Sequence, residues 1–195
     1  IGYPLIEALR GIEALPLAVV ADQFGGFIAL ATGGVIVASW YGGDRTHPAT
    51  LVRRIVLFPP FVACLVGVAA GRFGGWPDGL ERVLHLLGAT LSPLALLSIG
   101  LQLSLRVRAD AWRAIGIGLA WKLAAAPALV YAFGLAVGAR GLTLVVAVLQ
   151  AAIGPMVSAA ILAEEHKLDA TVANATLAIG VVLSLITVPA IDALL

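Results

Sequence analysis

The sequence predicts an all-α integral membrane protein. Hydrophobic residues make up 61% of the 195 residues and charged residues only 12%, and the mean hydropathy is +1.05. A soluble domain of this size does not need so much apolar surface. The apolar residues also gather in runs close to the roughly 20 residues that a helix needs to cross a bilayer. We therefore expect a multi-pass protein built from transmembrane helices.

The runs divide the chain into a short first helix and six spans. Residues 1–10 are too short to span and are expected to form a half-helix that starts at Pro4. Full spans follow at about 14–41, 54–71, 83–105, 113–138 and 169–195, with an interrupted span at 141–164. Because the chain begins without a methionine and inside an apolar segment, we expect it to be the C-terminal part of a longer protein.

The interrupted span is the feature around which the rest is organised. Gly154-Pro155 lies in its middle, and proline removes a backbone donor and clashes with the preceding turn. Freed backbone groups in hydrocarbon are tolerated only against protein or a water-filled cavity. We expect two half-helices, the second starting at Pro155, with Gln150 and Ser158 one turn to either side. Secondary transporters build sites this way, although a proline-kinked helix without a ligand is the simpler alternative.

A short internal sequence similarity supports the transporter interpretation. Pro4 and Pro155 each come after a glycine in an apolar context, and each is followed at the same sequence distance by a side-chain amide, Gln23 or Asn174. The two units are separated by an odd number of crossings, so they would face opposite ways. Paired broken helices in inverted halves point to a transporter site.

Loop charges predict the orientation, since cytoplasmic loops carry more Lys and Arg. The side of the membrane with more Lys and Arg residues would hold the loop 43–54. We therefore expect this loop to be cytoplasmic and the C-terminus to lie outside. One side holds four basic residues and the other seven: Arg10, Arg72, Arg82 and Arg140 against Arg45, Arg53, Arg54, Arg106, Arg108, Arg113 and Lys167.

Three blocks of the chain resemble the auxin efflux carrier family. They are GYPLIEALRGIEAL…VVADQFGGFIALATGG, RRIVLFPPFVACLVGV…LGATLSPLALLSIGLQL and LQAAIGPMVSAAILAEEHKLD…NATLAIGVVLSLITVPA. The resemblance implies a ten-helix transporter of two inverted five-helix repeats with crossed broken helices, as in bile-acid symporters and Na⁺/H⁺ antiporters. Residues 1–42 would end the N-terminal repeat and residues 55–195 would form the C-terminal one. The family's crossover prolines correspond to Pro4 and Pro155, its Asp-Gln pair after the first crossover to Asp22 and Gln23, and its glutamine before the second crossover to Gln150.

Polar residues inside the spans are the candidate binding residues. Asp22 is costly in a membrane, so it is expected to face a cavity, a partner or a titrating proton, unless it lies at the interface. Lys122 would balance an anion or instead extend to the headgroups. Gln23, Gln150 and Asn174 could bind a carboxylate or Na⁺, or join helix to helix. Further candidates beside the two breaks are Tyr3, Pro4, Glu7, Gly154, Pro155, Met156 and Ser158.

These features predict a secondary carrier of a small organic anion that works by alternating access. The alternatives are a Na⁺-coupled carrier like the bile-acid symporters and a non-transporting membrane scaffold. An intramembrane serine protease would need a serine and a histidine at matching depth, and no histidine falls mid-span, so we expect no enzyme. We expect no cofactor or metal site, with H⁺ or Na⁺ as coupling ions. The expected partners are the organic anion, the bilayer of a bacterial inner membrane and a second copy in a homodimer, with no nucleic acid.

Overall fold

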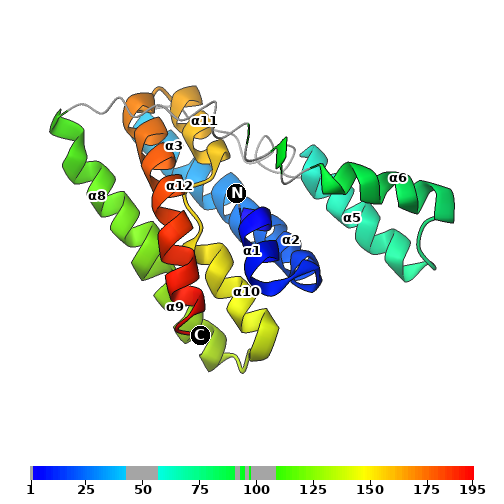
Figure 1. Ribbon diagram of the computed structural model, residues 1–195. Coiled ribbons are helices and arrows are strands. Elements are labelled where there is room, and N and C mark those ends of the chain that lie inside the picture. Colours follow the sequence, from blue (N-terminus) through cyan, green and yellow to red (C-terminus); the bar gives the residue numbers. More distant parts are fainter. Residues whose placement is uncertain (1, 43–56, 91–92, 95–96, 98–108) are drawn as a thin grey trace.

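The computed structural model describes residues 2–42, 57–90, 93–94, 97 and 109–195, and every regular element in these ranges is a helix. Figure 1 shows a bundle of helices with a helical hairpin, α5 and α6, at one side. Three helices of the described part are long and apolar enough to cross a membrane, and a bent pair would make a fourth. The predicted all-helical, membrane-spanning class is therefore confirmed, while the predicted loop 43–54 lies outside the described residues.

The N-terminal part is a short helix followed by one long helix. The short helix α1 spans Gly2–Arg10 and ends in a turn at Gly11, whose positive φ of 79° suits glycine. The long helix runs from Ile12 to Gly42, close to the predicted 14–41. Its segments are η1 (Ile12–Ala14), α2 (Leu15–Val20), η2 (Ala21–Phe27), η3 (Leu30–Gly34) and α3 (Val35–Gly42). The structure starts α1 before Pro4, because a proline in the first turn of a helix costs no hydrogen bond.

The α5–α6 hairpin contacts the long helix through aromatic rings. Helix α5 spans Pro59–Arg72, begins at the pair Pro59-Pro60, and places Phe61 against Phe24 and Phe27. The first residues of the predicted span 54–71 lie outside the described residues. Helix α6 spans Asp78–Ala89 and has no buried residue. The prediction that this helix begins at residue 83 is wrong. It begins at Asp78 because Pro77 and the acidic first turn favour a helix start there.

The C-terminal part contains the remaining long helices. One long helix joins α8 (Trp112–Ala120), the π-helical η5 (Trp121–Ala125) and α9 (Ala126–Ala136), preceded by the 3₁₀ turn η4 (Ala109–Ala111). Helices α10 (Gly141–Ala152) and α11 (Val157–Glu165) form the interrupted span, and α12 spans Ala170–Asp192. The Asp169 carboxylate caps α12 by accepting from the Val172 amide at 3.1 Å.

The interrupted span is bent by 43° between α10 and α11. Ile153 and Met156 are extended, with ψ angles of 147° and 142°. The prediction that the second half starts at Pro155 is wrong, because α11 starts only at Val157. A proline favours extended backbone on the residue before it, and the link between the two helices stays extended through Met156.

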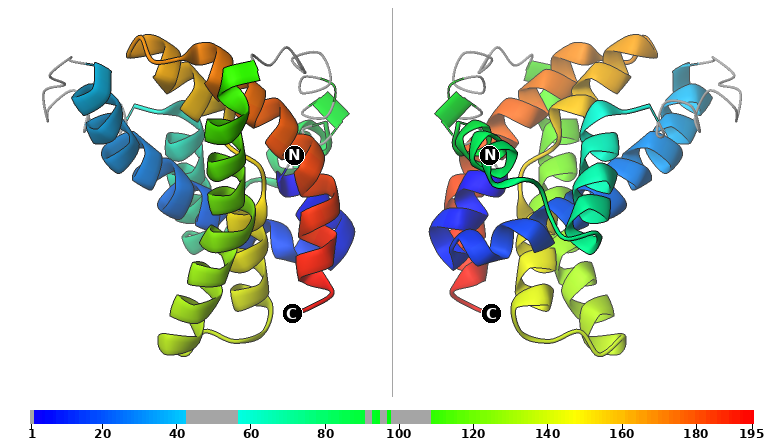
Figure 2. Two further views of the ribbon diagram at one scale, coloured as in Figure 1. Left: turned by 90° about the vertical axis from the view of Figure 1, so that its left-hand side faces the viewer. Right: turned by 90° about the vertical axis from the view of Figure 1, so that its right-hand side faces the viewer.

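The largest core cluster places α1 against this break. Ile6 of α1, Ala18 of α2, Leu149 of α10 and Val188 of α12 are fully buried together. The two views of Figure 2 show α1 at about mid-height of the bundle, and a Cβ on Gly2 of α1 would lie 2.8 Å from Ile153 Cδ1 in the extended link. The core therefore brings the first turn of α1 to the level at which α10 ends and α11 begins.

Candidate functional site

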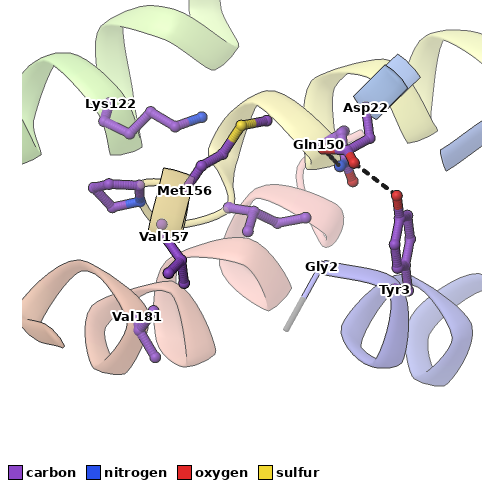
Figure 3. Close-up of a pocket in the computed structure, with 11 residues that line it drawn as sticks. Gly2, Tyr3, Asp22, Lys122, Gln150, Met156, Val157 and Val181 are labelled. Carbon is purple, nitrogen blue, oxygen red and sulfur yellow. Dashed lines mark hydrogen bonds between the residues drawn. The ribbon is translucent and has the colours of Figure 1, made fainter. Parts of the chain in front are cut away.

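A cavity of about 230 Å³ lies at the break between α10 and α11. Its walls come from six helical segments and the extended link, and Figure 3 shows the lining side chains. The lining residues are Gly2, Tyr3, Asp22, Lys122, Gln150, Ile153, Gly154, Pro155, Met156, Val157 and Val181. Ligand pockets for drug-sized molecules span about 300–1,000 Å³, so this cavity suits a smaller solute.

Asp22 is the centre of a hydrogen-bond cluster on one wall of the cavity. Its Oδ2 accepts from the Tyr3 hydroxyl at 2.7 Å and from Gln23 Nε2 at 3.1 Å. Its Oδ1 accepts from Gln150 Nε2 at 3.2 Å. Three donors from α1, η2 and α10 thus surround one carboxylate, which offsets part of the cost of holding a charge within the membrane.

Lys122 supplies the positive charge of the cavity. Its Nζ donates to the backbone oxygen of Ala151 at 2.7 Å, which satisfies a carbonyl in the last turn of α10. An ammonium group has three donors, so two remain for a solute in the cavity. Asp22 and Lys122 both lie in π-helical stretches, η2 and η5. Such stretches are frequent at functional sites because they shift a side chain off the regular helical face.

The extended link is fixed by close contact with α12. A Cβ on Gly154 would lie 2.9 Å from the carbonyl carbon and oxygen of Gly180, and a Cβ on Gly180 would lie 2.5 Å from Pro155 Cδ. Neither glycine leaves room for a side chain. The packing holds Met156, the last residue of the link, and Val157, the first residue of α11, at the cavity wall. Helix starts carry amides without intrahelical acceptors and the positive end of the helix dipole.

The structure brings most of the predicted site residues to this cavity. Seven of them line it: Tyr3, Asp22, Lys122, Gln150, Gly154, Pro155 and Met156. Gln23 does not line the cavity, but it is buried and bonded to Asp22.

Four predicted residues lie elsewhere. Pro4 and Glu7 belong to α1 but are not among the lining residues, and Ser158 faces a second cavity beside Leu162. Asn174 is exposed on α12. Gln23 and Asn174 have the same sequence distance from a proline, but their side chains lie in different surroundings. Gln23 is buried beside the Asp22 carboxylate, and Asn174 is not buried.

Sequence reasoning missed four lining residues, Gly2, Ile153, Val157 and Val181. Three of them are apolar residues in apolar segments, so no residue-type signal marks them. Ile153 and Val157 flank Gly154-Pro155, and a wider window around the break would have included them. Among the described residues there is no group of three or more His, Cys, Asp and Glu side chains arranged to hold a metal ion.

Two curated proteins and one family model match the chain. The chain is 29% identical over 194 residues to an uncharacterized transporter of Methanothermobacter thermautotrophicus, covering 97% of this chain and 61% of the relative. It is 28% identical over 108 residues to an uncharacterized transporter of Methanocaldococcus jannaschii, covering 53% of this chain and 34% of that relative. The chain therefore spans about three fifths of the first relative and one third of the second. No solved structure matches it. Residues 1–191 match the family described as membrane transport protein, and the chain belongs to that family.

Proposed function

We propose that the chain forms the binding site of a secondary carrier that moves a small organic anion by alternating access. One observation carries the proposal: the start of α11 and the Lys122 ammonium meet at one cavity beside a broken membrane helix. Helix starts bind anions through free amides and the dipole. Broken helices whose positive ends point at an anionic group are a recurrent transporter site.

The cavity's charges favour a carboxylate as substrate. Lys122 offers donors to one carboxylate oxygen, and the first amides of α11 offer donors to the other. Ile153, Val157 and Val181 supply an apolar wall for the rest of the molecule. A small mono- or dicarboxylate matches this arrangement of a charged end and an apolar side.

Movement of the helices around a fixed site would expose the anion to one side and then the other. The extended link holds few intrahelical hydrogen bonds, so α10 and α11 can change angle without unwinding a helix. In this proposal the fold is the ten-helix inverted repeat, with residues 55–195 as its C-terminal half and the C-terminus outside. The bacterial inner membrane and the homodimer belong to the same proposal.

The test is uptake of a panel of mono- and dicarboxylates by the full chain in proteoliposomes, with wild type, Lys122→Met and Lys122→Arg. A charge-assisted hydrogen bond contributes about 1.5–3 kcal/mol, so Lys122→Met should raise the apparent KM about 10- to 100-fold, and arginine should restore part of it. Lys167→Met is the matched control, since this lysine lies in the turn between α11 and α12. A protein that moves and binds no carboxylate would favour the scaffold alternative. A Lys122→Met variant with wild-type KM would contradict the proposed contact between Lys122 and the substrate.

A further inference from the structure

The Met156 side chain reaches from the extended link to η2. It lines the cavity, and a Cβ on Gly26 of η2 would overlap with the Met156 methyl group. The same Cβ position lies 3.8 Å from Met156 Sδ and 3.8 Å from Asp22 Oδ1. The missing side chain at Gly26 therefore leaves the place that the Met156 methyl group occupies, next to the Asp22 carboxylate.

The backbone of the link cannot move back to make more room for Met156. Gly154 and Pro155 pack against Gly180 of α12 so closely that no Cβ fits on either glycine. Methionine, by contrast, has three rotatable bonds and adapts its shape to its surroundings. A side chain added at Gly26 would therefore displace the Met156 side chain and not the link.

Met156 is also the most adaptable wall of the cavity. In the view of Figure 3, its side chain lies between Lys122 and Gln150. An anion held by Lys122 must fit the rest of its chain into about 230 Å³, beside Met156. Three other apolar lining side chains are β-branched and stiff at χ1, namely Ile153, Val157 and Val181.

We propose that Met156, seated on Gly26, limits the chain length of the anion that the cavity accepts. This size limit rests on the proposed function, because it concerns the substrate of the same site. Met156→Ala removes the sulfur and two carbons from the wall, so the cavity admits longer acids. Gly26→Ala turns the Met156 methyl group into the cavity, so the longest acids that wild type accepts are excluded.

The test is competition during uptake by the full chain in proteoliposomes. Uptake of the best-transported acid of the panel is measured in the presence of its shorter and longer unbranched homologues. One methylene group in an apolar pocket changes selectivity by about 10- to 200-fold. In Gly26→Ala, the longest effective competitor should weaken by such a factor relative to the shortest. In Met156→Ala, homologues too long for wild type should compete.

Gly25→Ala is the matched control, since a Cβ there would meet nothing within 4 Å. It should keep the wild-type order of competitors. The double variant Gly26→Ala/Met156→Ala has no methyl group to displace, so it should accept long homologues again. General damage by Gly26→Ala would weaken all homologues alike, and Met156→Ala would not relieve it. That result, or a wild-type order of homologues in Met156→Ala, would overturn the size limit and leave the proposed function standing.

A second measurement needs no carboxylate and still decides if a glycine variant does not fold. In a Cys64→Ser background, which removes the one cysteine of the chain, Val157→Cys places a thiol on the cavity wall. Its alkylation rates with a bulky and a small reagent are compared. Met156→Ala should raise the bulky-to-small ratio, and Gly26→Ala should lower it. An unchanged ratio in Met156→Ala would overturn the size limit. The expected ratios in a protein that moves no carboxylate would support the size limit and refute the proposed function.

Discussion

Gly154→Ala would place a methyl group where the backbone of α12 already lies. The added Cβ would come within 2.9 Å of the carbonyl carbon and oxygen of Gly180 and of the Val181 nitrogen. Ordinary contacts between carbon atoms are at about 3.5–4.0 Å. These neighbours are atoms of a helix backbone, so they cannot rotate away as a side chain does. Either the extended link or α12 must move.

The cost of this clash can be estimated from overpacked cores. Extra methyl groups in packed sites cost about 1–3 kcal/mol, and the rigid backbone neighbours place Gly154→Ala near the upper value. For a chain of this size, 1 kcal/mol shifts Tm by about 2–4 °C. We therefore expect Tm to fall by about 6–12 °C, measured by tryptophan fluorescence of the purified protein during heating.

Gly116→Ala is the matched control for the same chemical change. Gly116 lies within α8, and a Cβ there would meet nothing within 4 Å. Alanine is favoured over glycine inside a helix by about 0.5–1 kcal/mol, so this variant should melt slightly above wild type. If Gly154→Ala melts at or above wild type as well, the extended link is not packed against α12 and the reasoning fails.

Three further predictions concern the helix break, the Asp22 cluster and the ion pair between α1 and α12. Pro155→Ala should let α10 run on toward α11, so that transport in proteoliposomes is lost while the amount of inserted protein stays the same; unchanged transport rates would count against the broken-helix mechanism. Tyr3→Phe removes the 2.7 Å bond to Asp22, and hydrogen bonds to charged groups contribute about 1.5–3 kcal/mol, so thermal unfolding should show a lower Tm. An identical Tm would mean that this bond stabilises nothing. Arg10→Gln breaks the 2.6 Å ion pair with Asp192, whose side chains are 31% and 16% exposed. The loss should be at most about 1 kcal/mol and smaller in high salt, and a salt-independent loss would contradict an electrostatic cause.

The break in the membrane helix could be predicted from the sequence because its cause is local. Proline chemistry at Pro155 interrupts a helix in any surroundings, and the structure bends the chain at that place. The long helix Ile12–Gly42 was predictable for the same reason, since an apolar run of this length has few other structures in a bilayer. The start of α11 at Val157 depends on how the link packs on Gly180, which no local pattern records.

The partners of the polar residues could be predicted only in part. Membrane helices are apolar on every side, so periodicity does not show which face turns inward. Their residue types made Asp22 and Gln150 candidates, and the structure places both at one cavity, but nothing in the sequence shows that their side chains bond to each other. The same limit explains why Asn174 does not lie at the cavity. Its spacing from Pro155 copies that of Gln23 from Pro4, yet spacing does not fix how α12 is rotated, and the residue is exposed.

Protection of a single cysteine by the substrate tests the binding site most directly. In a Cys64→Ser background, Val157→Cys places a thiol on the wall of the cavity, and Ser158→Cys places one on the neighbouring residue, which faces the second cavity. The measurement is the alkylation rate of each thiol in proteoliposomes, with and without a transported carboxylate from the panel. We expect the carboxylate to slow alkylation at Val157→Cys and to leave Ser158→Cys unchanged. Equal protection of both thiols, or of neither, would contradict an anion bound at the start of α11.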